Sequence, residues 1–207
     1  MGRGFLAIFE MMKTDMDILV NHKLAHALLG SHAVFNYLTA IQNQITFDQK
    51  RDALNSLSAF AKFQRKLISL PDSEQWSVKE EVLLINEYFA IEKLRFGTQI
   101  DFALINQVTS RQMPSLVCVP FVELLLAAAM KSDSKPVFFE ITFVEEGSVL
   151  RCYISVNKVL KPIDKQERNT EQKKRFELIK EKLLMTNTAL NEIINRKQTQ
   201  YTLIFTH

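Results

Sequence analysis

A run of apolar residues with helical spacing, from Leu24 to Ile45, constrains the fold more than any other feature of the chain. Its members are separated alternately by four and three positions: Leu24, Leu28, Ser31, Phe35, Leu38, Gln42 and Ile45. This spacing places one stripe along a single helix face and predicts packing against a partner helix. We therefore expect a long helix from about residue 14 to 45, with Gly30-Ser31 as the place for a kink.

A second helix is predicted after a link of only three residues, 46–48. Asp48 is the predicted N-cap, because an aspartate side chain accepts hydrogen bonds from the first amides of a helix. The helix should run from Gln49 to about Ser69, and its apolar face comprises Leu54, Leu57, Phe60, Ala61, Gln64, Leu67 and Ile68. A link this short makes the two helices antiparallel neighbours, so the sequence predicts a helical hairpin.

The pattern changes near Gly97, after a third helix. Residues 77–80 (Ser-Val-Lys-Glu) fit a capping box, which opens a helix ending at about Phe96. Beyond it, strands and helices alternate: strands at 99–105, 137–144 and 149–156, helices at 121–130 and 172–186, and a hairpin of 190–194 with 201–206. We predict an α+β fold, with helices over about residues 1–96 and an α/β part over 97–207.

Composition narrows the class of protein. The chain has 207 residues, of which 47% are hydrophobic and 24% charged, so it can fill a core. A net charge of +3 without a basic–aromatic cluster argues against nucleic acid as a partner. There is no run of 18 apolar residues, and residues 1–12 lack a cleavage signal. Cys118 and Cys152 have no CxxC spacing and suggest reduced thiols, so we expect a cytoplasmic protein.

His32 is the side chain best placed for chemistry, at the flank of the apolar stripe. It could be an inert histidine at a helix–helix boundary, or a nucleophile that carries a phosphoryl group, since a neutral imidazole is nucleophilic near pH 7. Asn36, one turn later, could hydrogen-bond the imidazole or a phosphoryl oxygen, or simply be an exposed polar residue. His22 and His26 share a helix face, but no further ligand completes a metal site, so we expect no metal.

Several motifs in order carry a resemblance over residues 20–206. Gly30–Asn36 keeps the histidine, the second aromatic residue and the asparagine of Asn-Pro-His-Phe-Leu-Phe-Asn, and Leu54–Ser58 is also similar. Pro120–Glu123 matches a Pro-Leu-Val-Glu segment. A third helix with the pattern EE…Y…IE…RF is present as Glu80, Glu81, Tyr88, Ile91, Glu92, Arg95 and Phe96. These motifs resemble those of LytS-like sensor histidine kinases.

The resemblance implies a helical hairpin that dimerises into a four-helix bundle, followed by an ATPase-like α/β sandwich. The departures concern the nucleotide. Where the family has an asparagine that holds magnesium, this chain has Leu124, and a leucine offers no oxygen to a hard cation. Val156-Asn157-Lys158 stands in place of the adenine-binding Asp-x-Gly motif. No glycine follows Gly147, so the glycine-rich lid over the phosphates is missing.

We therefore expect a degenerate histidine-kinase fold that binds no ATP and is not an autokinase. One hypothesis is a histidine phosphotransferase that shuttles a phosphoryl group between His32 and receiver-domain aspartates, with Asn36 in support. It needs no cofactor of its own, because the receiver domain of a response regulator would supply Mg²⁺. The alternative is a non-catalytic pseudokinase that binds or regulates a kinase or response regulator. In both cases we expect a homodimer.

Overall fold

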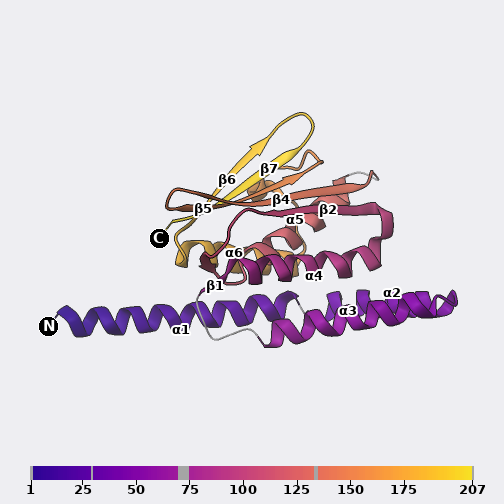
Figure 1. The fold of residues 1–207 in the computed structure, drawn as a ribbon, viewed down its shortest axis with the longest axis horizontal. Helices are drawn as coiled ribbons and strands as arrows, with labels where there is room; N and C mark the ends of the chain where they lie inside the picture. The colour runs from indigo at the N-terminus through magenta and orange to yellow at the C-terminus, as the bar shows by residue number, and fades with distance from the viewer. Residues whose placement is uncertain (1, 29, 70–74, 133–134, 207) are drawn as a thin grey trace.

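The computed structural model of the protein describes residues 2–28, 30–69, 75–132 and 135–206; the side chains of residues 2–11, 13 and 31–33 are outside this description. Three layers are visible in Figure 1. The lowest contains α1 (Gly2–Leu28), α2 (Ser31–Thr46) and α3 (Lys50–Ile68). In it α1 and α2 follow one another along the same line, and α3 runs back beside α2.

The middle layer consists of three helices that cover one face of a sheet: α4 (Val78–Phe96), α5 (Cys118–Ser132) and α6 (Thr170–Met185). The sheet has the strand order β2-β4-β5-β7-β6, and only its β2–β4 pair is parallel. Its strands are β2 (Ile100–Asn106), β4 (Val137–Glu146), β5 (Val149–Val156), β6 (Thr188–Ile194) and β7 (Thr199–Phe205). Six helices and a mixed five-stranded sheet confirm the α+β class over the described residues.

Local sequence signals set several of these boundaries. The capping box at α4 is formed: the Ser77 amide donates to Glu80 Oε2 at 2.7 Å, and the Glu80 amide donates to Ser77 Oγ at 3.3 Å. Gly97 ends α4 with φ +58°, a left-handed conformation that suits glycine. The β4–β5 hairpin turns through Gly147 and Ser148, as its residues predict.

Two expectations about the hairpin are wrong. Asp48 does not cap α3: the N-cap is Gln49, without a side-chain hydrogen bond, and Asp48 forms the turn itself with φ +58°. The apolar stripe is also not continuous, because the chain breaks into two helices at Gly30. Leu24 and Leu28 are buried, whereas residues of the stripe on α2 are exposed: Phe35, Leu38 and Ile45.

A short two-stranded sheet of β1 (Gln75–Ser77) and β3 (Gln112–Pro114) was not anticipated. It joins the start of α4 to the loop before α5. Three-residue strands have no periodicity that a sequence pattern could reveal, since alternation needs four or more residues to be recognised.

The helix α1 is fixed to the middle layer by buried polar contacts. Lys182 Nζ on α6 donates to both carboxylate oxygens of Asp17, at 2.7 and 2.8 Å, and the two side chains are 1% and 4% exposed. Asn21 Nδ2 donates to Ser115 Oγ at 2.7 Å. Breaking a buried ion pair costs about 3–5 kcal/mol, because one charge is left without its partner. The contact therefore holds α1 firmly against α6.

Candidate functional site

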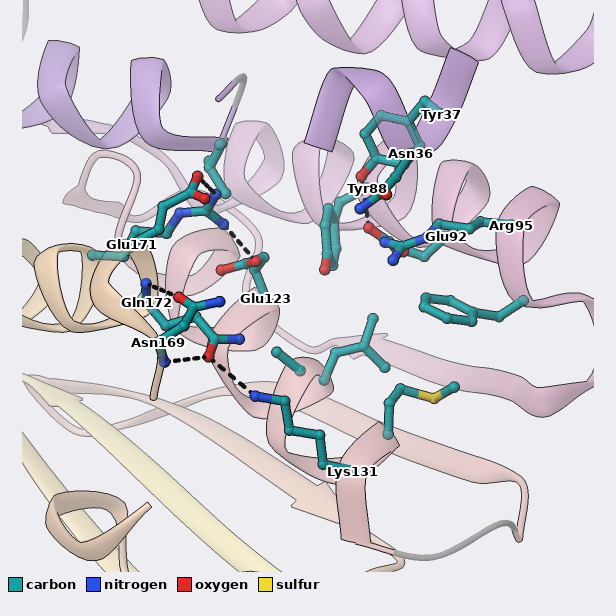
Figure 2. Close-up of a pocket in the computed structure, with 16 residues that line it drawn as sticks. Asn36, Tyr37, Tyr88, Glu92, Arg95, Glu123, Lys131, Asn169, Glu171 and Gln172 are labelled. Atoms are coloured by element: carbon teal, nitrogen blue, oxygen red, sulfur yellow. Dashed lines mark hydrogen bonds and ion pairs between the residues drawn. The ribbon is translucent and has the colours of Figure 1, made fainter. Parts of the chain in front are cut away.

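A cavity of about 320 Å³ lies where α2, α4, α5 and α6 meet. Figure 2 shows its polar side chains converging from these four helices. One part of its lining is apolar and comes from Leu28, Phe96, Leu126, Ala127 and Met130. Charged and amide groups form the remainder, so the cavity has a mixed rather than a uniformly charged wall.

The wall between α2 and α4 is built on Glu92. The Tyr37 hydroxyl on α2 donates to Glu92 Oε1 at 2.6 Å, and Arg95 Nη1 lies 3.4 Å from Glu92 Oε2. Burial raises the pKa of Glu92, while the Tyr37 hydrogen bond and the nearby Arg95 charge oppose the shift. Tyr88 contributes a second phenol, which Figure 2 shows directed into the cavity. The contact attaches α2 to the middle layer.

The wall between α5 and α6 is built on Arg175. Its Nη1 lies 2.6 Å from Glu123 Oε1 on α5, and its Nη2 lies 2.5 Å from Glu171 Oε1. Burial raises the pKa of Glu123, although the Arg175 charge favours its ionised form. Although Arg175 ends a run of three basic residues, 173–175, its side chain is only 8% exposed.

Gly30, at the start of α2, approaches this ion-pair network closely. A Cβ atom at Gly30 would lie 2.8 Å from Glu171 Oε1 and 3.1 Å from the Ala27 carbonyl oxygen. A side chain there would have to displace Glu171 from its place beside Arg175. The glycine therefore allows the turn between α1 and α2 to pack on α6.

The two predicted site residues both lie on α2. His32 is in the first turn of the helix, and its side chain is outside the described part of the structure. Asn36, one turn later, is half-buried and lines the cavity together with Tyr37. The structure thus places Asn36 among the charged groups of three other helices, α4, α5 and α6, which sequence reasoning did not predict.

Glu80 and Glu81, which are adjacent on α4, make different structural contacts. Glu80 caps α4, as described above. Glu81 is fully buried, and its Oε1 accepts from the amides of Cys118 (2.7 Å) and Val119 (3.1 Å) at the start of α5. Burial raises the pKa of Glu81 from 4.5 to about 7, although these amide hydrogen bonds favour the ionised form. Glu81 thereby ties the first turn of α5 to α4.

The surroundings of Leu124 on α5 differ from one side to the other. Leu124 is 2% exposed, and the space it shares with Gln166 and Arg168 is about 10 Å³. A more open space of about 370 Å³ adjoins it and is lined by Ala128, Leu160 and Gln166. The segment before α6 is fixed there, because Arg168 stacks on the Phe176 ring with its guanidinium carbon 3.8 Å from the ring centroid.

Asn157 is likewise engaged in the fold. Its side-chain oxygen accepts from the Phe138 amide at 2.7 Å, and its Nδ2 donates to the Pro136 carbonyl at 3.2 Å. It anchors the end of β5 to the start of β4. Leu124 offers no oxygen to a magnesium ion, and the Asn157 amide is already used in hydrogen bonds between β4 and β5.

Other candidate ligands lie elsewhere. His22 and His26 are exposed on α1, and Cys118 and Cys152 are buried as free thiols. Among the described residues, no three His, Cys, Asp or Glu side chains are grouped as a metal site would require. No helix within residues 2–28, 30–69, 75–132 or 135–206 is long and apolar enough to span a membrane.

Comparison with known proteins shows which proteins the chain resembles. Residues 21–100 match the histidine kinase family. The sensor histidine kinase YpdA of Escherichia coli (strain K12) is 34% identical over 129 residues, covering 61% of this chain and 22% of the relative. The sensor histidine kinase BtsS of the same strain is 32% identical over 103 residues, covering 49% and 18%. The chain thus spans about a fifth of the length of these curated relatives, to which it is similar.

One solved structure extends the likeness to the whole fold. It is described as a bacterial phosphotransferase and aligns over 98% of this chain and 97% of its own, with a TM-score of 0.51 and 10% sequence identity. At this identity the likeness concerns the fold alone.

Proposed function

We propose that the chain is a histidine phosphotransferase of a phosphorelay, in which His32 exchanges a phosphoryl group with receiver-domain aspartates. The observation that carries the proposal is a contrast between two places on α5. The His32-bearing helix is attached beside Glu123, whereas the adjacent Leu124 is 2% exposed and offers no oxygen to a nucleotide-bound magnesium ion. A chain with this arrangement needs a phosphoryl donor other than its own bound ATP.

The proposed reaction is a reversible transfer. An imidazole nitrogen of His32 attacks the phosphorus of an aspartyl phosphate, the P–N bond forms, and the P–O bond to the aspartate breaks. The carboxylate leaves with the electron pair, and a second receiver aspartate reverses the step. The receiver would bring Mg²⁺ and its own acidic ligands. Asn36 would support the phosphoryl group through its amide, and Tyr37 would hold α2 in place through Glu92.

A homodimer is part of the proposal. Apolar side chains on α2 and α3 are exposed although both helices pack on the middle layer with their other faces. These side chains are Phe35, Leu38, Ile45, Leu54, Leu57 and Ile68. An exposed apolar stripe of this kind suits the association of two hairpins as a four-helix bundle.

The alternative is a pseudokinase scaffold that binds a kinase or response regulator and does not use His32. One contact favours this candidate: the Tyr37 hydroxyl donates to buried Glu92 and fixes α2 on α4, as a docking scaffold requires. The two candidates differ in one property: only the phosphotransferase becomes labelled.

The experiment compares two phosphoryl donors for the same chain. Radiolabelled ATP and a panel of radiolabelled phospho-receiver domains are each incubated with the purified protein. The proposal expects label from a receiver and none from ATP. Label from ATP would contradict the proposal and indicate an autokinase. If no receiver transfers label, the proposal is also contradicted and the pseudokinase scaffold is favoured. Lys197→Ala, an exposed position in the β6–β7 turn, serves as a control that should keep the label.

A further inference from the structure

An open groove with a basic rim runs between α1 and α6, outside the cavity described above. It encloses about 570 Å³. Figure 1 shows the C-terminal half of α1 beneath α6, two helices from opposite ends of the chain. Exposed side chains from both helices form the rim: His22, Lys23, His26 and Lys174. We refer to this surface as the basic groove.

The charge of the basic groove is not neutralised by its own lining. Among the described residues that line it, Glu171 is the acid, and its carboxylate is paired with Arg175 at 2.5 Å. Lys23 and Lys174 therefore leave a net positive potential at the rim. Such a potential attracts an acidic partner and speeds the encounter.

The shape of the basic groove suits a protein surface. Its floor contains the small or apolar residues Ala27, Gly30 and Leu178, and its sides are open to solvent. Small-molecule pockets bury most of their ligand, whereas protein interfaces combine an apolar centre with a polar rim. An apolar side chain of a partner could rest on the floor while its carboxylates face the lysines.

The basic groove lies next to the start of α2, the helix that carries His32. Gly30 forms part of its floor and lies at the start of the helix that carries His32. The Glu171–Arg175 pair lines both the basic groove and the cavity that contains Asn36. A partner seated in the basic groove would therefore contact the first turn of α2.

The basic groove is also preformed. The buried pair of Asp17 and Lys182 joins the same two helices that form its walls. Binding would thus require little rearrangement, and preorganised interfaces lose less free energy on association.

We propose that the basic groove is the docking surface for an acidic protein partner, the face of a receiver domain that bears its phosphoryl-accepting aspartate. That face is acidic because carboxylates must hold its Mg²⁺. The inference rests on the proposed function for the identity of the partner. It adds the location of docking and assigns it to α1 and α6 rather than to the exposed stripe of α2 and α3.

The test measures binding and labelling separately. It uses the chain of 207 residues and the receiver domain that binds the wild type best. The double variant Lys23→Glu/Lys174→Glu should weaken receiver binding by at least about tenfold at low salt, mainly through slower association. The matched control Arg196→Glu/Lys197→Glu makes the same charge change in the β6–β7 turn and should bind within about twofold of the wild type. His32→Ala should bind normally and carry no label.

The outcomes separate the two proposals. Wild-type affinity in the Lys23→Glu/Lys174→Glu variant would overturn the inference, as would a wild-type chain that binds no receiver. A change in oligomeric state of that variant would assign the basic groove to a second copy of the chain and would also overturn it. Loss of binding in the groove variant, together with no labelling of the wild type, would support the basic groove and contradict phosphotransfer by His32.

Discussion

Replacing Glu81 by glutamine should remove a large part of the pH dependence of stability. The Glu81 carboxyl is fully buried at the junction of α4 and α5, and its Oε1 accepts from the amides of Cys118 and Val119. A glutamine side chain can accept the same two hydrogen bonds through its carbonyl oxygen but cannot ionise. The substitution thus changes the titration while keeping the contact.

The sign and size follow from the pKa of Glu81. Its pKa rises from 4.5 to about 7 on folding because burial disfavours the charged form. The folded protein then binds the proton more tightly than the unfolded chain. The stabilising effect is complete below pH 4.5 and is lost as the pH rises through about 7. A shift of this size corresponds to about 3 kcal/mol of unfolding free energy.

Urea denaturation of the wild type and Glu81→Gln at a series of pH values from about 4 to 8 measures this effect. Burial also raises the pKa values of Glu92 and Glu123, so the wild-type curve contains their contributions in the same direction. The difference between the two proteins isolates Glu81 and should change by about 3 kcal/mol across the range. Parallel curves would refute the reasoning.

Three further substitutions test the packing around α2. Gly30→Ala should destabilise the fold by about 1 kcal/mol in urea denaturation, because its Cβ meets Glu171, and Glu171→Ala should relieve part of that loss. Tyr37→Phe should cost about 1–3 kcal/mol in the same assay, since it removes the donor to buried Glu92; an unchanged midpoint would contradict the contact. Phe35→Glu should convert the proposed dimer to a monomer in light scattering, and an unchanged molar mass would contradict the proposed interface.

Local chemistry explains which parts of the fold could be predicted. The capping box at Ser77, the glycine that ends α4 and the Gly147 turn each depend on residues within a few positions of one another. The prediction that Asp48 caps α3 was wrong because aspartate is favoured both at helix N-caps and in left-handed turns. Only the structure distinguishes the two. The interruption of the long helix near Gly30-Ser31 was predicted as a kink, because glycine weakens a helix locally.

Sequence reasoning predicted only part of the site, because long-range packing brings its other residues together. His32 and Asn36 could be named from one short motif. The groups that surround Asn36 come from helices far apart in sequence, and Arg175 was hidden in a run of charges. Its spacing from buried Ile179 and Lys182, four and seven positions later, is a helical signal that could have placed it on the inner face of α6.

The central claim is that His32 carries the phosphoryl group. The most direct measurement is phosphate transfer from a labelled receiver domain to wild type and to His32→Ala, followed by acid treatment and discharge to a second receiver. The account predicts an acid-labile label on the wild type alone that passes to the second receiver. Equal labelling of both proteins, or no label on the wild type while both bind the receiver tightly, would contradict it.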